Sequence, residues 1–416
     1  MRIQDRLEKI NNATVLDTTD FALHPHRTIV IRQGTIAEIR ATDDSDRPGP
    51  AVLDADGRIA MPGLIDAHVH VTAATAGLGD IAHASPNYIA AQSSRIMQQM
   101  LARGFTTVRD VAGADYGLAQ AVEEGLFRGP RLIFGGKALS QTGGHGDMRG
   151  PGQSQVDNHR CCPAIGVVCD GETAVRTAAR DQLRTGAHHL KIMLSGGVAS
   201  PTDRVDSIQF SDAEIRAAVE EAEACNRYVT GHAYTARAVN RGLRLGVRCI
   251  EHGNLIDDES VELFKEYGAF LVPTLVTYVH LKRDGAATGL PVESQRKVDH
   301  VLAAGLEALD RATRGGVKIA FGTDLLGAMH EYQSEEFEIR AQVQSSEEVL
   351  RSASLTAAEL IGAEGKLGVL APGAHADILL LNADPLADVT VLAHPEQSID
   401  QIIKAGVLEV DHAASR

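Results

Sequence analysis

Apolar and polar residues alternate along both ends of the chain. The alternation occurs in segments 12–17, 27–41 and 51–60, and again in segments 375–385 and 401–410. A period of two is typical of strands with one buried face, and glycine-containing turns separate the segments. The pattern predicts that the two ends pair into a small β-sandwich domain.

The middle of the chain alternates short apolar runs with longer amphipathic ones. Eight apolar runs predict strands, at residues 64–68, 106–110, 131–135, 189–193, 228–232, 247–252, 270–275 and 318–324. Amphipathic helices are predicted between them, for example at residues 87–104, 172–186 and 211–226. Ser211 is a suitable N-cap for the third of these helices, and Gly186 follows the second. Eight strand–helix units predict an α/β fold with a (β/α)8 TIM barrel, with a doubly wound open sheet as the alternative.

These patterns predict a division of the chain into two domains. Residues 1–62 and 366–416 form the β-sandwich, and residues 63–365 form the barrel. Within the barrel, the glycine-rich stretch 135–171 has no clear periodicity. A structureless loop of that length in a compact domain is usually functional.

Composition narrows the class of protein. Of the 416 residues, 44% are hydrophobic and 23% are charged, as in a globular protein. The net charge of −15 argues against a nucleic-acid partner, which would require clustered lysine and arginine. The charged N-terminus is not a signal peptide, and the sequence has no apolar stretch long enough to span a membrane. We therefore expect a cytoplasmic protein, and an acidic barrel of this kind often forms a symmetric homo-oligomer.

The five cysteines have no regular spacing. An odd number of cysteines in a long chain does not indicate a disulfide framework. Cys161, Cys162 and Cys169 are close in sequence, but no second Cys or His pair lies at zinc-finger spacing. We expect them to be reduced thiols in a loop.

Residues able to bind metal are found at or near the carboxyl ends of the predicted strands. They are His68 and His70 at the end of the first strand, Lys191 in the fourth, His232 at the end of the fifth, His252 at the end of the sixth and Asp324 at the end of the eighth. In a (β/α)8 barrel the carboxyl ends of the strands converge on one mouth, where active sites form. The sequence therefore predicts that these six side chains meet.

Each of these residue types suits metal chemistry. Two histidines at i and i+2 on a strand point to the same side, and neutral imidazole suits zinc. Asp324 offers a carboxylate that can bind a metal or accept a proton from metal-bound water. Two ions about 3.5–4 Å apart can share a hydroxide. Lys191 is a poor ligand as an ammonium, but a buried neutral amine can add carbon dioxide and form a carbamate with two oxygens.

Several longer motifs resemble those of a known family. They are MPGLIDAHVH, GFTTVRDVAG, ALSQTGGHGD, LKIMLSGGVASPTD, GHAYT, IEHGNLID, VPTLVTY, FGTDLLG and LGVLAPGAHADILLL. Over nearly its whole length the chain resembles the amidohydrolase superfamily, in the binuclear branch of imidazolonepropionase-like and prolidase-like enzymes. Within that branch it is most similar to Xaa-Pro dipeptidases and N-acyl-amino-acid hydrolases, some of which cleave the amide of ochratoxin.

The resemblance implies a role for each metal-binding residue. His68, His70 and Asp324 would hold the more buried of two divalent ions, and zinc is the expected metal. His232 and His252 would hold the other ion. A carboxylated Lys191 would bridge the two ions together with a hydroxide that attacks the amide. Asp324 would also take the proton of the attacking water and pass it to the leaving amine.

The resemblance also implies two substrate contacts. His145 and Tyr234 match positions that bind the carbonyl or the α-carboxylate of the C-terminal residue. The expected substrate is a small molecule with a free carboxylate: a dipeptide ending in proline or a hydrophobic residue, or an N-acyl amino acid. Segment 147–170 differs from the family pattern, which leaves the substrate preference open.

Other interpretations compete with this one. A mononuclear deaminase or a cyclic-amide or lactone hydrolase would need no bridging Lys191, and a non-enzymatic assembly protein would need no complete ligand set. His145 can also structure its glycine-rich turn, and Tyr234 can be a packing aromatic. Arg109 is expected to be a structural ion-pair partner, whereas His330 and the run 195–200 are weaker candidates for the pocket wall.

Overall fold

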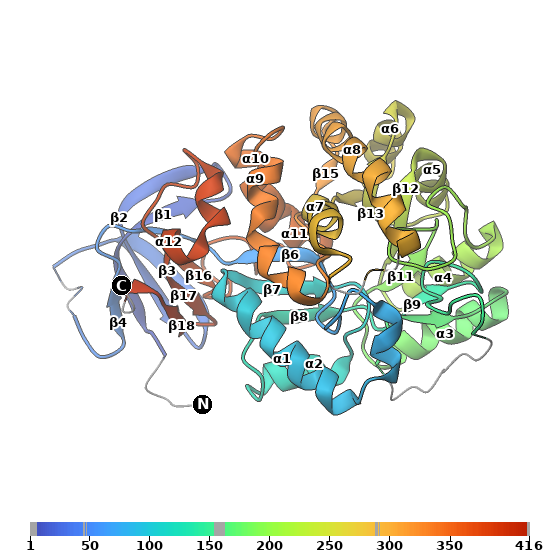
Figure 1. Ribbon diagram of the computed structural model, residues 1–416. Helices are drawn as coiled ribbons and strands as arrows, with labels where there is room; N and C mark the ends of the chain where they lie inside the picture. The colour runs from blue at the N-terminus through green and yellow to red at the C-terminus, as the bar shows by residue number, and fades with distance from the viewer. Residues whose placement is uncertain are drawn as a thin grey trace. The chain divides into compact units, whose positions relative to one another are not determined.

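The computed structural model describes residues 6–44, 46, 48–153, 163–287, 290 and 292–413 (Figure 1). The chain divides into two compact units. The first contains residues 1–66, 98–107 and 337–416, and the second contains residues 67–97 and 108–336. The domain boundaries at 62/63 and 365/366 stay a prediction.

The first unit contains an eight-stranded sheet built from both ends of the chain. Its strands are β1 (Lys9–Asp17), β2 (Ala22–Arg32), β3 (Thr35–Ala41), β4 (Val52–Asp54), β5 (Ile59–Pro62), β16 (Ile378–Leu381), β17 (Ile399–Lys404) and β18 (Val407–Asp411). The order is β18-β17-β16-β5-β1-β2-β3, and β4 pairs with β1. The antiparallel pairing of β5 with β16 joins the two ends and confirms that they pair. All eight strands belong to one hydrogen-bonded sheet, and the sandwich stays a prediction.

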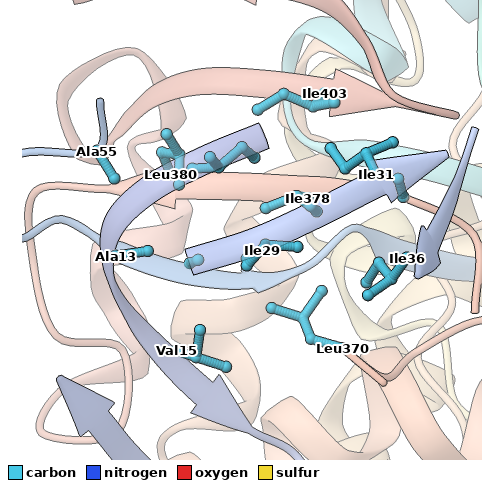
Figure 2. Close-up of a cluster of buried hydrophobic side chains, with 13 residues drawn as sticks. Ala13, Val15, Ile29, Ile31, Ile36, Ala55, Leu370, Ile378, Leu380 and Ile403 are labelled. Atoms are coloured by element: carbon cyan, nitrogen blue, oxygen red, sulfur yellow. The ribbon is translucent and has the colours of Figure 1, made fainter. Parts of the chain in front are cut away.

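Alternating aliphatic residues form the core against this sheet. Ile29 and Ile31 on β2 are buried, whereas Val30 between them is only partly covered. They belong to the same apolar cluster as Ile378 on β16 and Ile403 on β17 (Figure 2). Burying each such side chain contributes about 1.5–3 kcal/mol, so the period-two pattern is sufficient to fix which face packs inward.

All eight runs predicted as strands in the middle of the chain form strands. They are β6 (Leu64–Val69), β7 (Phe105–Asp110), β8 (Arg131–Phe134), β11 (Leu190–Met193), β12 (Val229–Thr235), β13 (Cys249–Leu255), β14 (Phe270–Val272) and β15 (Lys318–Ile319). One sheet has the order β10-β9-β11-β12-β13-β14-β15, and another has the order β6-β7-β8. The pairs from β11 to β15 are parallel, as expected for an α/β fold.

Backbone hydrogen bonds also connect these two sheets. The amide of His188, just before β11, donates to the carbonyl of Phe134, the last residue of β8 (2.8 Å). The amide of Ala67 on β6 donates to the carbonyl of Phe321 (2.7 Å), just after β15. These bonds place the ends of the first and last predicted strands side by side, while closure into a barrel stays a prediction.

Helices occur in both units, and one follows each strand from β10 to β14 (Figure 1). The longer ones are α1 (Pro86–Ala102), α2 (Tyr116–Glu123), α3 (Glu172–Arg184), α4 (Asp212–Ala224), α5 (Ala236–Arg244), α6 (Asp258–Glu266), α7 (Leu275–Asp284) and α8 (Val292–Arg314). The shorter ones are α9 (Glu336–Arg340), α10 (Ser346–Arg351), α11 (Ala357–Leu360) and α12 (Pro395–Ser398). Ser211 caps α4 in a capping box with Glu214, and Gly186 follows α3 with φ +96°, as predicted.

The described part of the stretch 135–171 contains regular secondary structure. It contains β9 (Ala138–Ser140) and β10 (Gly166–Val168), which pair in parallel, so the prediction of a structureless loop was wrong. These three-residue strands were too short for a period of two to be recognised. Cys161 and Cys162 lie outside the described residues.

Two further predictions from the sequence concern the cysteines and membrane-spanning segments. Cys169, Cys225 and Cys249 are free thiols there, and Cys169 and Cys249 are buried. None of the helices described is long and apolar enough to cross a bilayer.

Candidate metal centre

All eight side chains predicted to form the site line a single pocket of the second unit. The pocket has a volume of about 540 Å³, which includes its opening to solvent. The predicted residues in its wall are His68, His70, His145, Lys191, His232, Tyr234, His252 and Asp324. The others are Leu78, Met148, Ile165, Met193, Val198, Ala199, Tyr278, Leu281 and Leu326. Polar ligands are thus held within a largely apolar wall.

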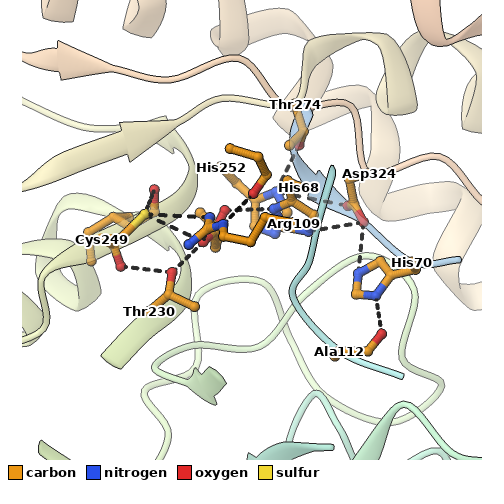
Figure 3. Close-up of polar contacts among 12 residues, drawn as sticks. His68, His70, Arg109, Ala112, Thr230, Cys249, His252, Thr274 and Asp324 are labelled. Atoms are coloured by element: carbon orange, nitrogen blue, oxygen red, sulfur yellow. Dashed lines mark hydrogen bonds and ion pairs between the residues drawn. The ribbon is translucent and has the colours of Figure 1, made fainter. Parts of the chain in front are cut away.

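Three of these residues form a compact group of potential metal ligands. The Nε2 atoms of His68 and His70 lie 3.3 and 3.2 Å from Oδ1 of Asp324. One ligand atom from each residue lies within 4.8 Å of the others (Figure 3). The two histidines come from the end of β6 and the aspartate from the segment after β15, which the Ala67–Phe321 bond holds beside it.

The Nδ1 atoms of His68 and His70 each form a hydrogen bond with a residue outside this group of three. Nδ1 of His70 donates to the carbonyl of Ala112 (2.6 Å), and Nδ1 of His68 donates to the carboxylate of Glu251 (2.7 Å). These bonds place a hydrogen on Nδ1 and turn the Nε2 atom of each ring toward Asp324. That is the orientation a metal-binding histidine needs.

His232 and His252 add two more imidazoles to the pocket wall. Their ring centroids are 4.6 Å apart, and the ring of His252 is 5.0 Å from that of His68. Nδ1 of His252 lies 2.9 Å from the hydroxyl of Thr274, which directs Nε2 the other way. Nε2 of His232 donates to the carbonyl of Gly196 (3.2 Å), so Nδ1 is its available nitrogen.

Burial sets the charges of these groups. It lowers the pKa of both His232 and His252 well below the ordinary value. Burial alone would raise the pKa of Asp324, but the charges and hydrogen bonds of His68 and His70 outweigh it and lower that pKa. The neutral imidazoles of His232 and His252, the two other histidines and the anionic Asp324 together form a donor set that fits a divalent cation.

Lys191 is almost fully buried on β11, with 2% of its surface exposed. Burial lowers the pKa of its amine to about 8, although Glu251 and Asp324 oppose the shift. A lysine with this pKa is partly a neutral amine at neutral pH, the form required for reaction with carbon dioxide. Its position and charge state therefore fit the bridging role implied by the sequence.

The backbone at two of the candidate ligands is unusual. His252 has φ +76° and Asp324 has φ +54°, in a region that residues other than glycine seldom adopt. The amide of Asp324 donates to the carbonyl of His68 (2.8 Å), which helps to hold this conformation. Strained positions of this kind concentrate at functional sites, and no residue pattern in the sequence pointed to them.

A buried ion pair supports the site from behind. Nη2 of Arg109 lies 2.6 Å from Oε1 of Glu251, with both side chains fully buried, while Nε of Arg109 donates to the carbonyl of Ala67 (2.6 Å). This confirms Arg109 as a structural ion-pair partner. Sequence analysis missed Glu251, although it directly precedes a candidate ligand, His252, in the IEH motif.

Two more contacts concern the predicted substrate-binding residues. The ring of His145 stacks on that of His232, with centroids 4.0 Å apart and planes at 19°. The hydroxyl of Tyr278 donates to that of Tyr234 (3.2 Å) and lies 3.0 Å from Nδ1 of His252. Tyr278 was missed as a site residue, although the motif VPTLVTY contains it.

The two weaker candidates for the wall have different outcomes. Val198 and Ala199 of the run 195–200 do line the pocket. His330 does not belong to the described lining: its Nε2 atom donates to the carbonyl of Ala73 (3.1 Å). Its predicted place in the wall was therefore wrong.

Comparison with known proteins identifies the family. Residues 59–408 match the amidohydrolase family, so the chain belongs to it. The family generally uses divalent metals, and the chain is a hydrolase that acts on C–N bonds.

Individual relatives agree with this assignment. The chain is 32% identical to ochratoxinase of Aspergillus niger over 366 residues, which cover 84% of this chain and 75% of the relative. It is similar to the crystal structure of a prolidase complexed with N-methylphosphonate-L-proline, with 47% identity, a TM-score of 0.94, and coverage of 97% of this chain and 99% of the other. A Xaa-Pro dipeptidase with bound methionine has 28% identity, a TM-score of 0.85, and coverage of 96% and 98%.

Proposed function

We propose that this protein is a binuclear metal-dependent hydrolase of small amides that carry a free carboxylate. Its substrates are dipeptides ending in proline or a hydrophobic residue, and N-acyl amino acids, including amides of the ochratoxin type. The observation that carries this proposal is the convergence of six potential ligands with His145 and Tyr234 on one pocket.

The positions of these side chains support the proposed ligand sets. His68, His70 and Asp324 would hold one ion and His232 and His252 the second, and zinc is the proposed metal. Lys191, as a carbamate, would provide oxygen ligands to both ions. The bonds that join β6 to the segment after β15, and β8 to the start of β11, support closure of the strands into a (β/α)8 barrel whose mouth contains the site.

The chemistry divides between the ions and the chain. Bound divalent ions would lower the pKa of water from about 15.7 to about 7 and polarise the scissile carbonyl. Asp324, as an anion beside the two histidines, accepts the proton of the attacking water and returns it to the leaving amine. His145 and Tyr234 bind the carboxylate end of the substrate and so align the amide with Asp324.

The relatives and the pocket wall support this class of substrate. Two similar structures are named as a prolidase and a Xaa-Pro dipeptidase, and one relative is named ochratoxinase. Leu78, Met148, Ile165, Met193 and Leu326 provide apolar surface for a hydrophobic group on either side of the amide.

A panel of dipeptides and N-acyl amino acids, assayed with zinc and bicarbonate, tests the proposal. We expect turnover of substrates with a C-terminal carboxylate and little turnover of their carboxamides. Lys191→Ala should lose bound metal and activity together, whereas Lys265→Ala, at an exposed position on α6, should keep both. Two ions per chain in Lys191→Ala, or no turnover of any carboxylate substrate, would contradict the proposal.

The alternative is a mononuclear deaminase or a cyclic-amide or lactone hydrolase. The compact group of His68, His70 and Asp324 is the observation that favours this alternative, because these three residues could bind one ion without the other candidate ligands. One ion per chain in fully active protein would establish this alternative. The cytoplasmic location and the homo-oligomer remain predictions.

A further inference from the structure

Asp203 is a buried carboxylate in the segment between β11 and α4, next to the pocket. Only 2% of its side chain is exposed. Its Oδ2 atom accepts hydrogen bonds from the amide of Gly197 (3.2 Å) and from Nε2 of Gln209 (3.0 Å). Its Oδ1 atom accepts a hydrogen bond from the hydroxyl of Ser200. A carboxylate that is so fully bonded has a fixed orientation.

Ser200 connects this carboxylate to His145. Because its hydroxyl donates to Asp203, its oxygen can only accept from Nδ1 of His145, 2.7 Å away. The same Nδ1 atom lies 3.6 Å from Oδ2 of Asp203. The hydrogen of the His145 ring is thereby assigned to Nδ1, and the Nε2 edge is left to the pocket.

Two close neighbours restrict the His145 ring. One face stacks on His232. On Gly197, an added Cβ atom would lie only 2.2–2.6 Å from three ring atoms of His145, so a residue without a side chain is required there. Stacking sets the plane of the ring, and the bond to Ser200 sets its rotation within that plane.

The charge of Asp203 is balanced within the same cluster. Nζ of Lys297 on α8 lies 3.4 Å from Oδ1 and also donates to the carbonyls of Gly197 and Ser200, each at 3.0 Å. Burial alone would raise the pKa of Asp203, but His145, Ser200 and Lys297 lower it to about 2. Asp203 is therefore an anion at neutral pH, and α8 is tied to the segment that holds His145.

We infer that Asp203 is a positioning residue: through Ser200, it holds the His145 ring so that the Nε2 edge meets the carboxylate of the substrate. This inference rests on the proposed function, since His145 acts there as a substrate contact. Asp203 itself does not belong to the described lining of the pocket and acts only through His145.

Asp203→Asn is the test. The amide introduced by Asp203→Asn would present its hydrogens to Gly197 and Gln209 if its nitrogen replaces Oδ2. It would present them to Ser200 and Lys297 if its nitrogen replaces Oδ1, so either orientation disturbs the cluster with little change in volume. A carboxylate contact is made in both the ground state and the transition state, so KM should rise about 10–100-fold while kcat stays within about threefold. A fall in kcat at unchanged KM, or no change in either constant, would overturn the inference.

Two controls separate positioning from general damage. Asp206→Asn makes the same change in the same segment, at an exposed residue that pairs with Arg204, and should leave both constants unchanged. In a His145→Gln background, Asp203→Asn should have no further effect on KM, because the residue it positions is absent. Independent, additive losses in the double variant would show that Asp203 acts by another route.

An NMR measurement tests the inference independently of the proposed function. In zinc-loaded protein with ¹⁵N-labelled histidine, the His145 signals are identified by their absence from His145→Gln. We expect a hydrogen on Nδ1 of His145 in the wild type. In Asp203→Asn this hydrogen should be absent from Nδ1 or should exchange with solvent. Unchanged signals would overturn the positioning role, whereas a changed signal in a protein without activity on any carboxylate substrate would refute only the proposed function.

Discussion

Glu251 offers the sharpest test of how the site is supported, because three groups depend on its carboxylate. It accepts hydrogen bonds from Arg109, His68 and Thr230, and its side chain is fully buried. Burial alone would raise the pKa of Glu251, but the charge of Arg109 and the other neighbours lowers it well below the ordinary value. Glu251→Gln keeps the shape of the side chain and removes the charge.

The size of the effect follows from this geometry. Removing one partner of a buried ion pair costs about 3–5 kcal/mol, because the guanidinium of Arg109 stays buried without compensation. For a unit of this size, each kcal/mol lowers the melting temperature by about 2–4 °C, so a decrease of about 10 °C is expected. The side-chain amide introduced by Glu251→Gln can also turn a hydrogen toward Nδ1 of His68, which should weaken metal binding about 10–100-fold.

Calorimetry of the metal-free protein and a competition titration with a chelator measure the two effects. The matched control is Glu262→Gln, because Glu262 forms an exposed ion pair with Lys265. The control should change stability by no more than about 0.5 kcal/mol. Equal melting temperatures for Glu251→Gln and the control would refute the argument that the Arg109–Glu251 pair supports the site.

Three other predictions follow from single contacts. Tyr278→Phe removes the hydroxyl that donates to Tyr234, so kcat/KM for carboxylate substrates should fall about 5–10-fold with the metal content unchanged, as steady-state kinetics and metal analysis would show. Gly197→Ala places a methyl group against the ring of His145 and should raise KM at least tenfold without unfolding the protein, as kinetics and circular dichroism would show. The hydrogen bond from Arg40 lowers the pKa of Asp46, so the ionised carboxylate stabilises the folded protein above about pH 4. This stabilisation is lost as the pH falls below about 4, so acid unfolding of Asp46→Asn should depend less steeply on pH than that of the wild type.

Local patterns in the sequence were sufficient for much of this protein. Each of the eight apolar runs predicted in the middle segment contains a strand, because each run carries enough apolar side chains to be recognised. The parallel strand–helix order also predicted that ligands such as His68 and Asp324 would meet, since the carboxyl ends of such strands lie together. A short strand such as β9 (Ala138–Ser140), inside a glycine-rich stretch, carries too few side chains for that signal.

Only the tertiary structure decided which residues support the ligands. Glu251, Asp203 and Tyr278 act on residues that are distant in sequence, namely His68, His145 and Tyr234. The separation is 183 positions for Glu251 and His68, and 44 positions for Tyr278 and Tyr234. No local period encodes such contacts, because they depend on how loops and strand ends pack. The sequence by itself therefore determined the longer strands and the residue types that are able to bind a metal, and packing in three dimensions determined the orientation and charge of these residues.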